Sequence, residues 1–166
     1  MKTMTRSRSK VRANILTGRR PTRKNKGGRK DITKVNSSLA STIVQTFLHM
    51  LNTVKLYHWR TTSFATHKAT DELYGSLNSK IDEFVEVMLG KDEMGGRAKL
   101  LNVHVIKLDM FSNNASFKKQ VEIYKTYLLH LSEDPVFSAL MNTDLLAIRD
   151  EILALFNQFL YLLTLG

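Results

Sequence analysis

The stretch that decides the fold is residues 63–90, SFATHKATDELYGSLNSKIDEFVEVMLG. Its large hydrophobic residues recur every three or four positions, which is the spacing of one buried helix face. These residues are Leu73, Leu77, Ile81, Phe84 and Met88. Ser63 is a favourable N-cap residue and Gly90 a common C-terminal stop. The stretch therefore predicts one long amphipathic helix.

The same spacing predicts three further helices, and no segment shows the period-two alternation of a β-strand. The first runs from a cap at residues 36–38 to about Trp59, the third from Asn114 to about Leu131, and the fourth from residue 142 or 143 to Leu162. Residues 91–112 are less regular, with one helical turn expected within 98–108. The pattern predicts an all-α four-helix bundle over residues 35–166. Beyond Leu153 the last helix is apolar on more than one face, which predicts burial against another subunit.

Positive charge is concentrated at the start of the chain. The 166 residues carry a formal net charge of +10. Residues 1–34 hold thirteen bases and one acid, a net of +12, whereas residues 35–166 hold twelve bases and fourteen acids, a net of −2. We therefore divide the chain into an extended basic arm, residues 1–34, and a near-neutral bundle, residues 35–166. The bases expected to contact a partner are Arg6, Arg8, Lys10, Arg12, Arg19, Arg20, Arg23, Lys24, Lys26, Arg29 and Lys30.

This arm predicts binding to a polyanion such as DNA, or to neighbouring structural proteins. No aromatic residue is interleaved with the bases, so binding to nucleic acid would be driven by charge and independent of sequence. A nuclear localisation cluster at residues 19–26 is an alternative. The chain has no cysteine, which excludes disulfides and thiol catalysis. Its longest apolar stretch, residues 153–165, contains three polar residues, and we expect no membrane span.

The second predicted helix also carries a polar set that packing does not explain. With about 100° per residue, His67, Asp71, Asp82 and Glu86 share a flank roughly 130° from the buried face. They extend over about 28 Å, too far for one metal site within a single chain. Two antiparallel copies related by a two-fold axis would place His67 of one chain opposite Asp82 and Glu86 of the other. Imidazole and carboxylate groups together suit a divalent metal such as iron.

These residues resemble a known family, the Dps mini-ferritins. The resemblance is carried by KLYHW at residues 55–59, by TDLL at residues 143–146, and by Phe64, His67, Asp71, Asp82 and Glu86. It implies a ferritin-like bundle that oligomerises, oxidises Fe(II) with peroxide, stores the mineral and binds DNA through basic tails. It also implies an iron site at the two-fold axis, with His58, His67 and Asp71 from one subunit and Asp82 and Glu86 from the other. No residue is assigned a catalytic role beyond these ligands.

The sequence departs from the Dps pattern in three places, one of which is an arm longer than most Dps tails. The interval from His58 to His67 is about three residues shorter, and apolar residues 87–89 replace an acidic run. Residues 57–90 as a whole are similar to an uncharacterised ferritin-like family of large DNA viruses. We therefore favour a structural or assembly protein, such as a minor capsid component of a virion. In that case it would be found in the virion or in the host nucleus or cytoplasm. The alternative is a Dps-type ferroxidase in the cytoplasm or nucleoid.

Overall fold

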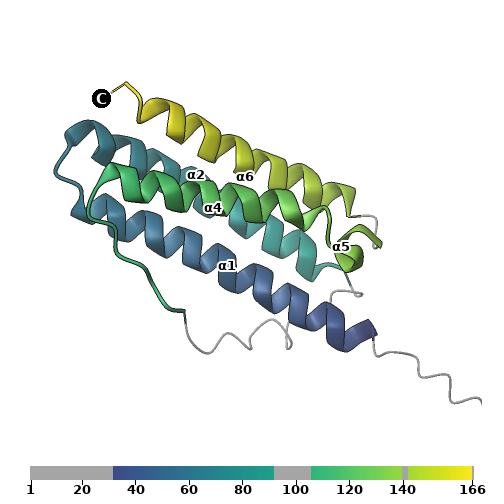
Figure 1. The fold of residues 1–166 in the computed structure, drawn as a ribbon. Coiled ribbons are helices and arrows are strands. Elements are labelled where there is room, and N and C mark those ends of the chain that lie inside the picture. Colours follow the sequence, from purple (N-terminus) through teal and green to yellow (C-terminus); the bar gives the residue numbers. More distant parts are fainter. Residues whose placement is uncertain (1–31, 92–105, 140–141, 166) are drawn as a thin grey trace, which may run out of the picture.

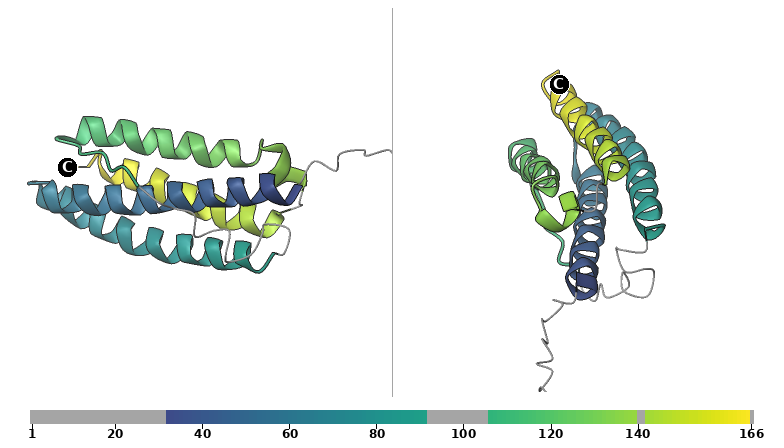
Figure 2. Two further views of the ribbon diagram at one scale, coloured as in Figure 1. Left: turned by 90° about the horizontal axis from the view of Figure 1, so that it is seen from below. Right: turned by 90° about the vertical axis from the view of Figure 1, so that its right-hand side faces the viewer.

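The computed structural model describes residues 32–91, 106–139 and 142–165. Five helices occur in these ranges: α1 (Ile32–Arg60), α2 (Phe64–Leu89), α4 (Asn114–Leu131), α5 (Pro135–Ala139) and α6 (Thr143–Leu162). The four long helices lie side by side with their axes roughly aligned (Figures 1 and 2), and the described residues contain no strand. The predicted all-α four-helix bundle is confirmed.

The order and direction of the helices include one long crossover. α1 and α2 form a hairpin joined by residues 61–63, and α4 begins at the same end of the bundle as α2 (Figure 1). α2 and α4 therefore run in the same direction, and the chain between them must return along the whole bundle. α6 runs back antiparallel to α4.

Helix boundaries agree with the sequence pattern except at two places. Ser63 caps α2 by accepting a hydrogen bond from the Thr66 N–H at 3.3 Å, and Asn113 caps α4 in the same way with Ser116 at 2.9 Å. α1, however, begins at Ile32, so the cap expected at residues 36–38 is wrong and those residues lie inside the helix. The short α5 was not expected after Pro135. The turn predicted within 98–108 lies mainly outside the described residues.

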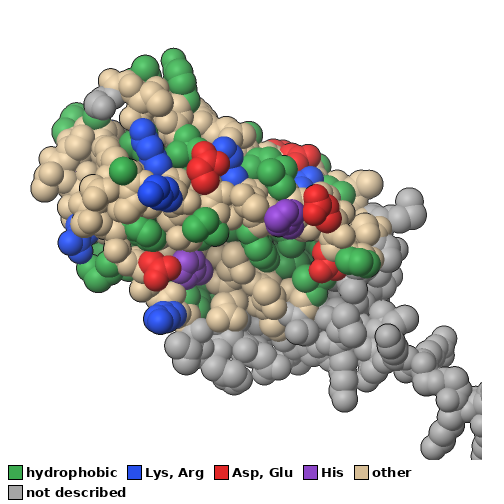
Figure 3. Space-filling model, in the orientation of Figure 1, with side chains coloured by type: hydrophobic (Ala, Val, Ile, Leu, Met, Phe, Trp, Pro, Cys, Tyr) green, Lys and Arg blue, Asp and Glu red, His purple; other side chains and the backbone are tan. Residues whose placement is uncertain are grey.

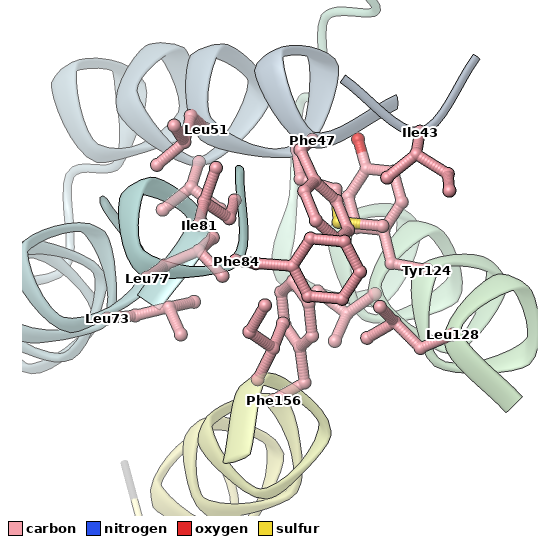
Figure 4. Packing of buried hydrophobic residues seen from close by; sticks show 14 of the residues in the cluster. Ile43, Phe47, Leu51, Leu73, Leu77, Ile81, Phe84, Tyr124, Leu128 and Phe156 are labelled. Atoms are coloured by element: carbon pink, nitrogen blue, oxygen red, sulfur yellow. The ribbon is translucent and has the colours of Figure 1, made fainter. Parts of the chain in front are cut away.

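Aromatic rings fill the centre of the bundle. Phe47 of α1 meets Phe84 of α2 edge to face, with ring centroids 5.0 Å apart, and Phe156 of α6 approaches Tyr124 of α4 at 5.8 Å (Figure 4). Both phenylalanines of the first pair are fully buried. Among the described residues, no carboxylate is buried. The described core therefore offers no carboxylate ligands for a metal site inside the bundle.

A polar contact lies between α1 and α4, and we call it the α1–α4 seam (His49, Asp109 and Tyr124). The Tyr124 hydroxyl is 3.0 Å from Nδ1 of His49, and the other ring nitrogen, Nε2, lies 3.6 Å from a carboxylate oxygen of Asp109. Burial raises the pKa of Tyr124 to about 12. Both nitrogens of His49 thus face a partner, so His49 has a structural role at this contact.

Candidate metal and assembly site at the α1–α2 corner

The two histidines of the predicted metal site meet where α1 ends and α2 begins. The His58 and His67 rings stack with centroids 4.0 Å apart and planes inclined by 25°. Each ring bonds to the backbone of the other residue: Nδ1 of His58 lies 3.1 Å from the His67 carbonyl, and Nδ1 of His67 lies 3.1 Å from the His58 carbonyl. We call this arrangement the histidine pair. These two reciprocal contacts hold the end of α1 against the start of α2.

These contacts determine which ring nitrogen remains available. A backbone carbonyl can only accept a hydrogen bond, so Nδ1 of each neutral histidine must carry the proton. The lone pair of each imidazole is then on Nε2, which is the form that binds a metal ion. Backbone carbonyls commonly fix metal-binding histidines in this way. The His58 carbonyl is also one of the last carbonyls of α1, so His67 satisfies an acceptor that the end of the helix leaves open.

Asp71 stands beside the pair, one helical turn after His67. Its Oδ1 atom is 3.8 Å from Nε2 of His58, and its side chain is 59% exposed whereas that of His58 is 8% exposed. This separation is too long for a direct hydrogen bond. Two ligands with metal bonds of about 2.1 Å lie roughly 3–3.5 Å apart on one ion. A small rotation of the exposed carboxylate would bring Asp71 and His58 into that range.

Three hydrogen-bonding side chains hold the corner in place from behind. Thr70 donates to the carbonyls of Thr66 and His67 at 2.8 and 3.0 Å, and its oxygen is 3.3 Å from Nδ1 of His58. Asn114, the first residue of α4, donates to Thr66 at 3.3 Å and accepts a hydrogen bond from the Tyr57 hydroxyl. Burial raises the pKa of Tyr57, which keeps that hydroxyl protonated as a donor. The sequence pattern did not reveal this polar support.

Asp82 and Glu86 lie farther along α2 and are exposed. Asp82 is eleven residues from Asp71, about 17 Å along a helix. Within residues 32–91, 106–139 and 142–165, no group of three His, Cys, Asp or Glu side chains is close enough to hold a metal ion. One chain places His67 and Asp71 beside His58 without forming a three-ligand group, and it leaves Asp82 and Glu86 farther along α2. The predicted five-ligand set requires a second chain.

The corner also exposes large aromatic side chains. Trp59 is 68% exposed and Phe64 is 76% exposed, although both are hydrophobic. The ammonium group of Lys55 lies over the Tyr74 ring at 4.5 Å and near the Trp59 ring at 5.7 Å. Exposed aromatic residues next to cations are typical of surfaces that bind another macromolecule. Trp59, near the end of α1, therefore lies on the surface and not in the hydrophobic core.

The face seen in Figure 3 has a mixed character. On the face seen in Figure 3, acidic, basic and hydrophobic side chains are interspersed, without a large region of one charge in the part described. The bases assigned to the arm, from Arg6 to Lys30, lie outside the described residues. No helix in the described ranges is long and apolar enough to cross a membrane.

The fold and the corner together define a class: a four-helix bundle with a partly buried histidine pair between the end of its first helix and the start of its second. A comparison with protein families matches residues 58–163 to a family of unknown function (DUF5856), and the chain belongs to that family. The matched region begins at His58 and includes all five predicted metal ligands. Comparisons with curated proteins and with solved structures gave no match.

Proposed function

We propose that the protein is a structural subunit of a larger assembly, such as a minor capsid component in the particle of a large DNA virus. In this proposal the bundle pairs with other subunits, and the basic arm tethers it to nucleic acid or to neighbouring proteins. The observation that carries the proposal is the exposure of two large aromatic side chains, Trp59 near the end of α1 and Phe64 at the start of α2. Aromatic residues of this size are enriched in protein interfaces, where they bury much hydrophobic area.

The distribution of charge supports the tether. The +12 arm precedes a bundle of net charge −2, so attraction to a polyanion would be confined to one end of the chain. Such binding releases counterions, and its affinity falls steeply as salt rises. α1 begins at Ile32, so residues 1–31 can be removed without shortening the helix.

Removal of residues 1–31 tests the tether. We expect the truncated bundle to fold normally but to lose most of its affinity for double-stranded DNA at 50–200 mM salt, roughly 10³-fold or more. A full-length control with the eleven arm bases changed to Gln separates charge from chain length. If the truncated protein binds DNA and its natural assembly partners as tightly as the full chain, the tether is excluded.

A second candidate function is favoured by the histidine pair. The fixed Nδ1–H tautomers and the adjacent Asp71 support a Dps-type ferroxidase whose substrate is Fe(II). His58, His67 and Asp71 of one subunit, with Asp82 and Glu86 of another, would bind the iron. Iron held there would be oxidised by peroxide. The protein's part is to orient two imidazole lone pairs and to supply carboxylates that balance the ferric charge.

Ferric absorbance after addition of Fe(II) and peroxide measures this activity. We expect Asp82→Ala and His67→Ala to abolish the signal, and His130→Ala to leave it unchanged, because His130 is an exposed histidine of α4 away from the corner. If the purified wild-type oligomer gives no iron-dependent signal, the ferroxidase function is excluded and the structural role remains.

A further inference from the structure

A groove runs along the surface between α2 and α6, which lie side by side in the bundle (Figure 2). We call it the α2–α6 groove. Its wider part encloses about 510 Å³, and its walls there include the short side chains of Ser79 and Ala154 as well as Gly75. A Cβ atom added at Gly75 would have no other atom within 4 Å, so this wall borders open space. The groove continues towards the corner, because Ser76 and Leu155 line its narrower part as well.

The narrower part of the groove has an apolar floor. Leu73 and Phe159 are buried there, whereas Leu155 and Leu162 remain partly exposed. Burial of such surface is favourable only when the occupant also removes apolar atoms from water. An occupant of this part therefore needs aliphatic or aromatic side chains of its own.

The rim of the groove carries more acids than bases. Lys80 forms an ion pair with Glu83 at 2.9 Å and a second one with Glu151 of α6, so two carboxylates share one ammonium group. Beside the narrower part, Glu72 is exposed and has no ion-pair partner in the described part of the chain. Three carboxylates thus surround one base, and the rim favours a cationic occupant.

The basic arm contains one segment with both of these properties. All the valine, isoleucine and leucine side chains that precede Ile32 fall within residues 11–16, VRANIL. Bases stand on both sides of this segment and within it, at Arg8, Arg12 and Arg19. Aliphatic side chains among arginines are the chemical complement of an apolar floor with an acidic rim.

The arm is attached where it can reach the groove within its own chain. α1 begins at Ile32, at the end of the bundle where α6 also begins (Figure 1). From that end Leu155 lies about 18 Å along α6, and the bundle is about 20 Å wide. The chain from Ile15 to Ile32 spans up to about 56 Å when extended. This length is enough to cross the end of the bundle and enter the groove.

We propose that residues 11–16 dock in the α2–α6 groove of the same chain, with their aliphatic side chains on its apolar floor and the neighbouring arginines against its acidic rim. This interaction goes beyond the proposed function, since it requires neither a polyanion nor a second subunit. Bases held by the rim are not free to contact phosphates. A polyanion must therefore displace the arm from the groove, which lowers its apparent affinity for the chain.

The cysteine-free chain allows a photo-crosslinker to be placed at a single position. We attach benzophenone to full-length Ala154→Cys, on the wall of the groove, and to the matched control Ile123→Cys, at an exposed position of α4. We expect the label at 154 to crosslink to residues 8–20 about tenfold or more above the label at 123, because the docked segment is held next to it. Mass spectrometry of mixed ¹⁵N-labelled and unlabelled protein separates crosslinks within one chain from crosslinks between chains.

Removal of the aliphatic side chains tests the contact with the floor. We expect Ile15→Ser/Leu16→Ser, combined with Ala154→Cys, to reduce the crosslink by about fivefold or more. Met4→Ser removes an apolar side chain outside residues 11–16 and should leave the crosslink within a factor of about two. Both changes keep every base of the arm and the whole bundle. No crosslink from position 154, an equal crosslink after Ile15→Ser/Leu16→Ser, or crosslinks only between chains would overturn the proposal.

These results are distinguishable from those that test the tether. If the crosslink forms within one chain but deletion of residues 1–31 changes neither DNA binding nor assembly, the docking stands and the tethered structural role fails. If that deletion abolishes DNA binding but position 154 does not crosslink to the arm, the tether stands and the docking is wrong.

Discussion

The α1–α4 seam and the α1–α2 corner each place a histidine of α1 near a carboxylate, yet they leave the two rings in different states. At the seam, His49 has the Tyr124 hydroxyl on Nδ1 and Asp109 near Nε2. At the corner, Nδ1 of His58 is held by a backbone carbonyl, and Nε2 lies 3.8 Å from the exposed Asp71. The seam uses both nitrogens of its histidine in packing, whereas the corner uses one and leaves the other for a ligand.

This difference shows that a histidine next to an acid is not by itself a site. What matters is whether each of the two ring nitrogens already has a fixed hydrogen-bonding or charged partner within the protein. A backbone carbonyl at Nδ1 selects the tautomer and exposes the Nε2 lone pair, while a tyrosine hydroxyl within the core ties the ring to a neighbouring helix. The seam should therefore control stability, and the corner should control binding.

The largest expected effect is at the seam. Tyr124→Ala removes a buried ring that contacts Phe156 and leaves His49 without its hydroxyl partner, so we expect a loss of about 3–5 kcal/mol in the free energy of unfolding. At the corner, Trp59→Ala should change it by less than about 0.5 kcal/mol, because that ring is exposed. Urea denaturation of both variants measures the contrast. Equal losses would mean that the two regions do not differ as described.

The effect on metal affinity should be larger for a substitution at the corner than for one at the seam. We expect His58→Gln to weaken Zn²⁺ binding by about 100-fold in an isothermal titration of the oligomer, and His49→Gln to leave it within a factor of about two. The reason is that Nε2 of His58 carries its lone pair beside the exposed Asp71, whereas both nitrogens of His49 face a partner within the protein. A similar loss in both variants would point to misfolding, and no loss in His58→Gln would remove the histidine pair from the site.

Alkaline pH should lower the free energy of unfolding through Tyr124 of the seam. Burial raises the pKa of Tyr124 to about 12, above its ordinary value of 10.0, so its contribution to stability is complete below pH 10. It is lost as the pH rises towards 12, because the unfolded state ionises first. The difference in unfolding free energy between wild type and Tyr124→Phe should shrink by up to about 2 kcal/mol over that range. A difference that does not change with pH would contradict this assignment.

The smallest effect is expected outside both regions. A hydrogen bond from Lys91 lowers the pKa of Asp144 at the start of α6. Its contribution is present above the pKa of the unfolded state and is lost as the pH falls through the lower pKa of the folded state. The side chain is 51% exposed, so after solvent screening Asp144→Asn should cost about 0.5 kcal/mol or less at pH 7. A loss greater than about 1 kcal/mol for Asp144→Asn would show that the Lys91–Asp144 pair stabilises the fold more than an exposed ion pair should.

The sequence pattern predicted the bundle because the buried positions follow the helical period closely. The stripe from Leu73 to Met88 is buried throughout, and the caps at Ser63 and Asn113 fit local chemistry. The start of α1 was misplaced because serine and asparagine are good caps but are also tolerated inside helices. The short α5 was missed because five residues are too few to show a periodic pattern.

The site was predictable in its residues but not in its geometry. Spacing along α2 identified His67, Asp71, Asp82 and Glu86 as one flank, and the resemblance added His58. Nothing in one-dimensional spacing reveals that two rings stack, that backbone carbonyls fix their tautomers, or that Asn114 supports the corner from another helix. Those features depend on how α1, α2 and α4 pack, which is a tertiary property.

The direction of α1 has a consequence for any polyanion bound to the arm. Ile32 and His58 lie at opposite ends of this helix, about 39 Å apart. In the antiparallel pair that the second helix's sequence predicts, the two copies of Ile32 would lie at opposite ends. The two attachment points would then face away from each other, so one dimer would join two separate segments of polyanion. Such a particle would crosslink a polyanion into a network.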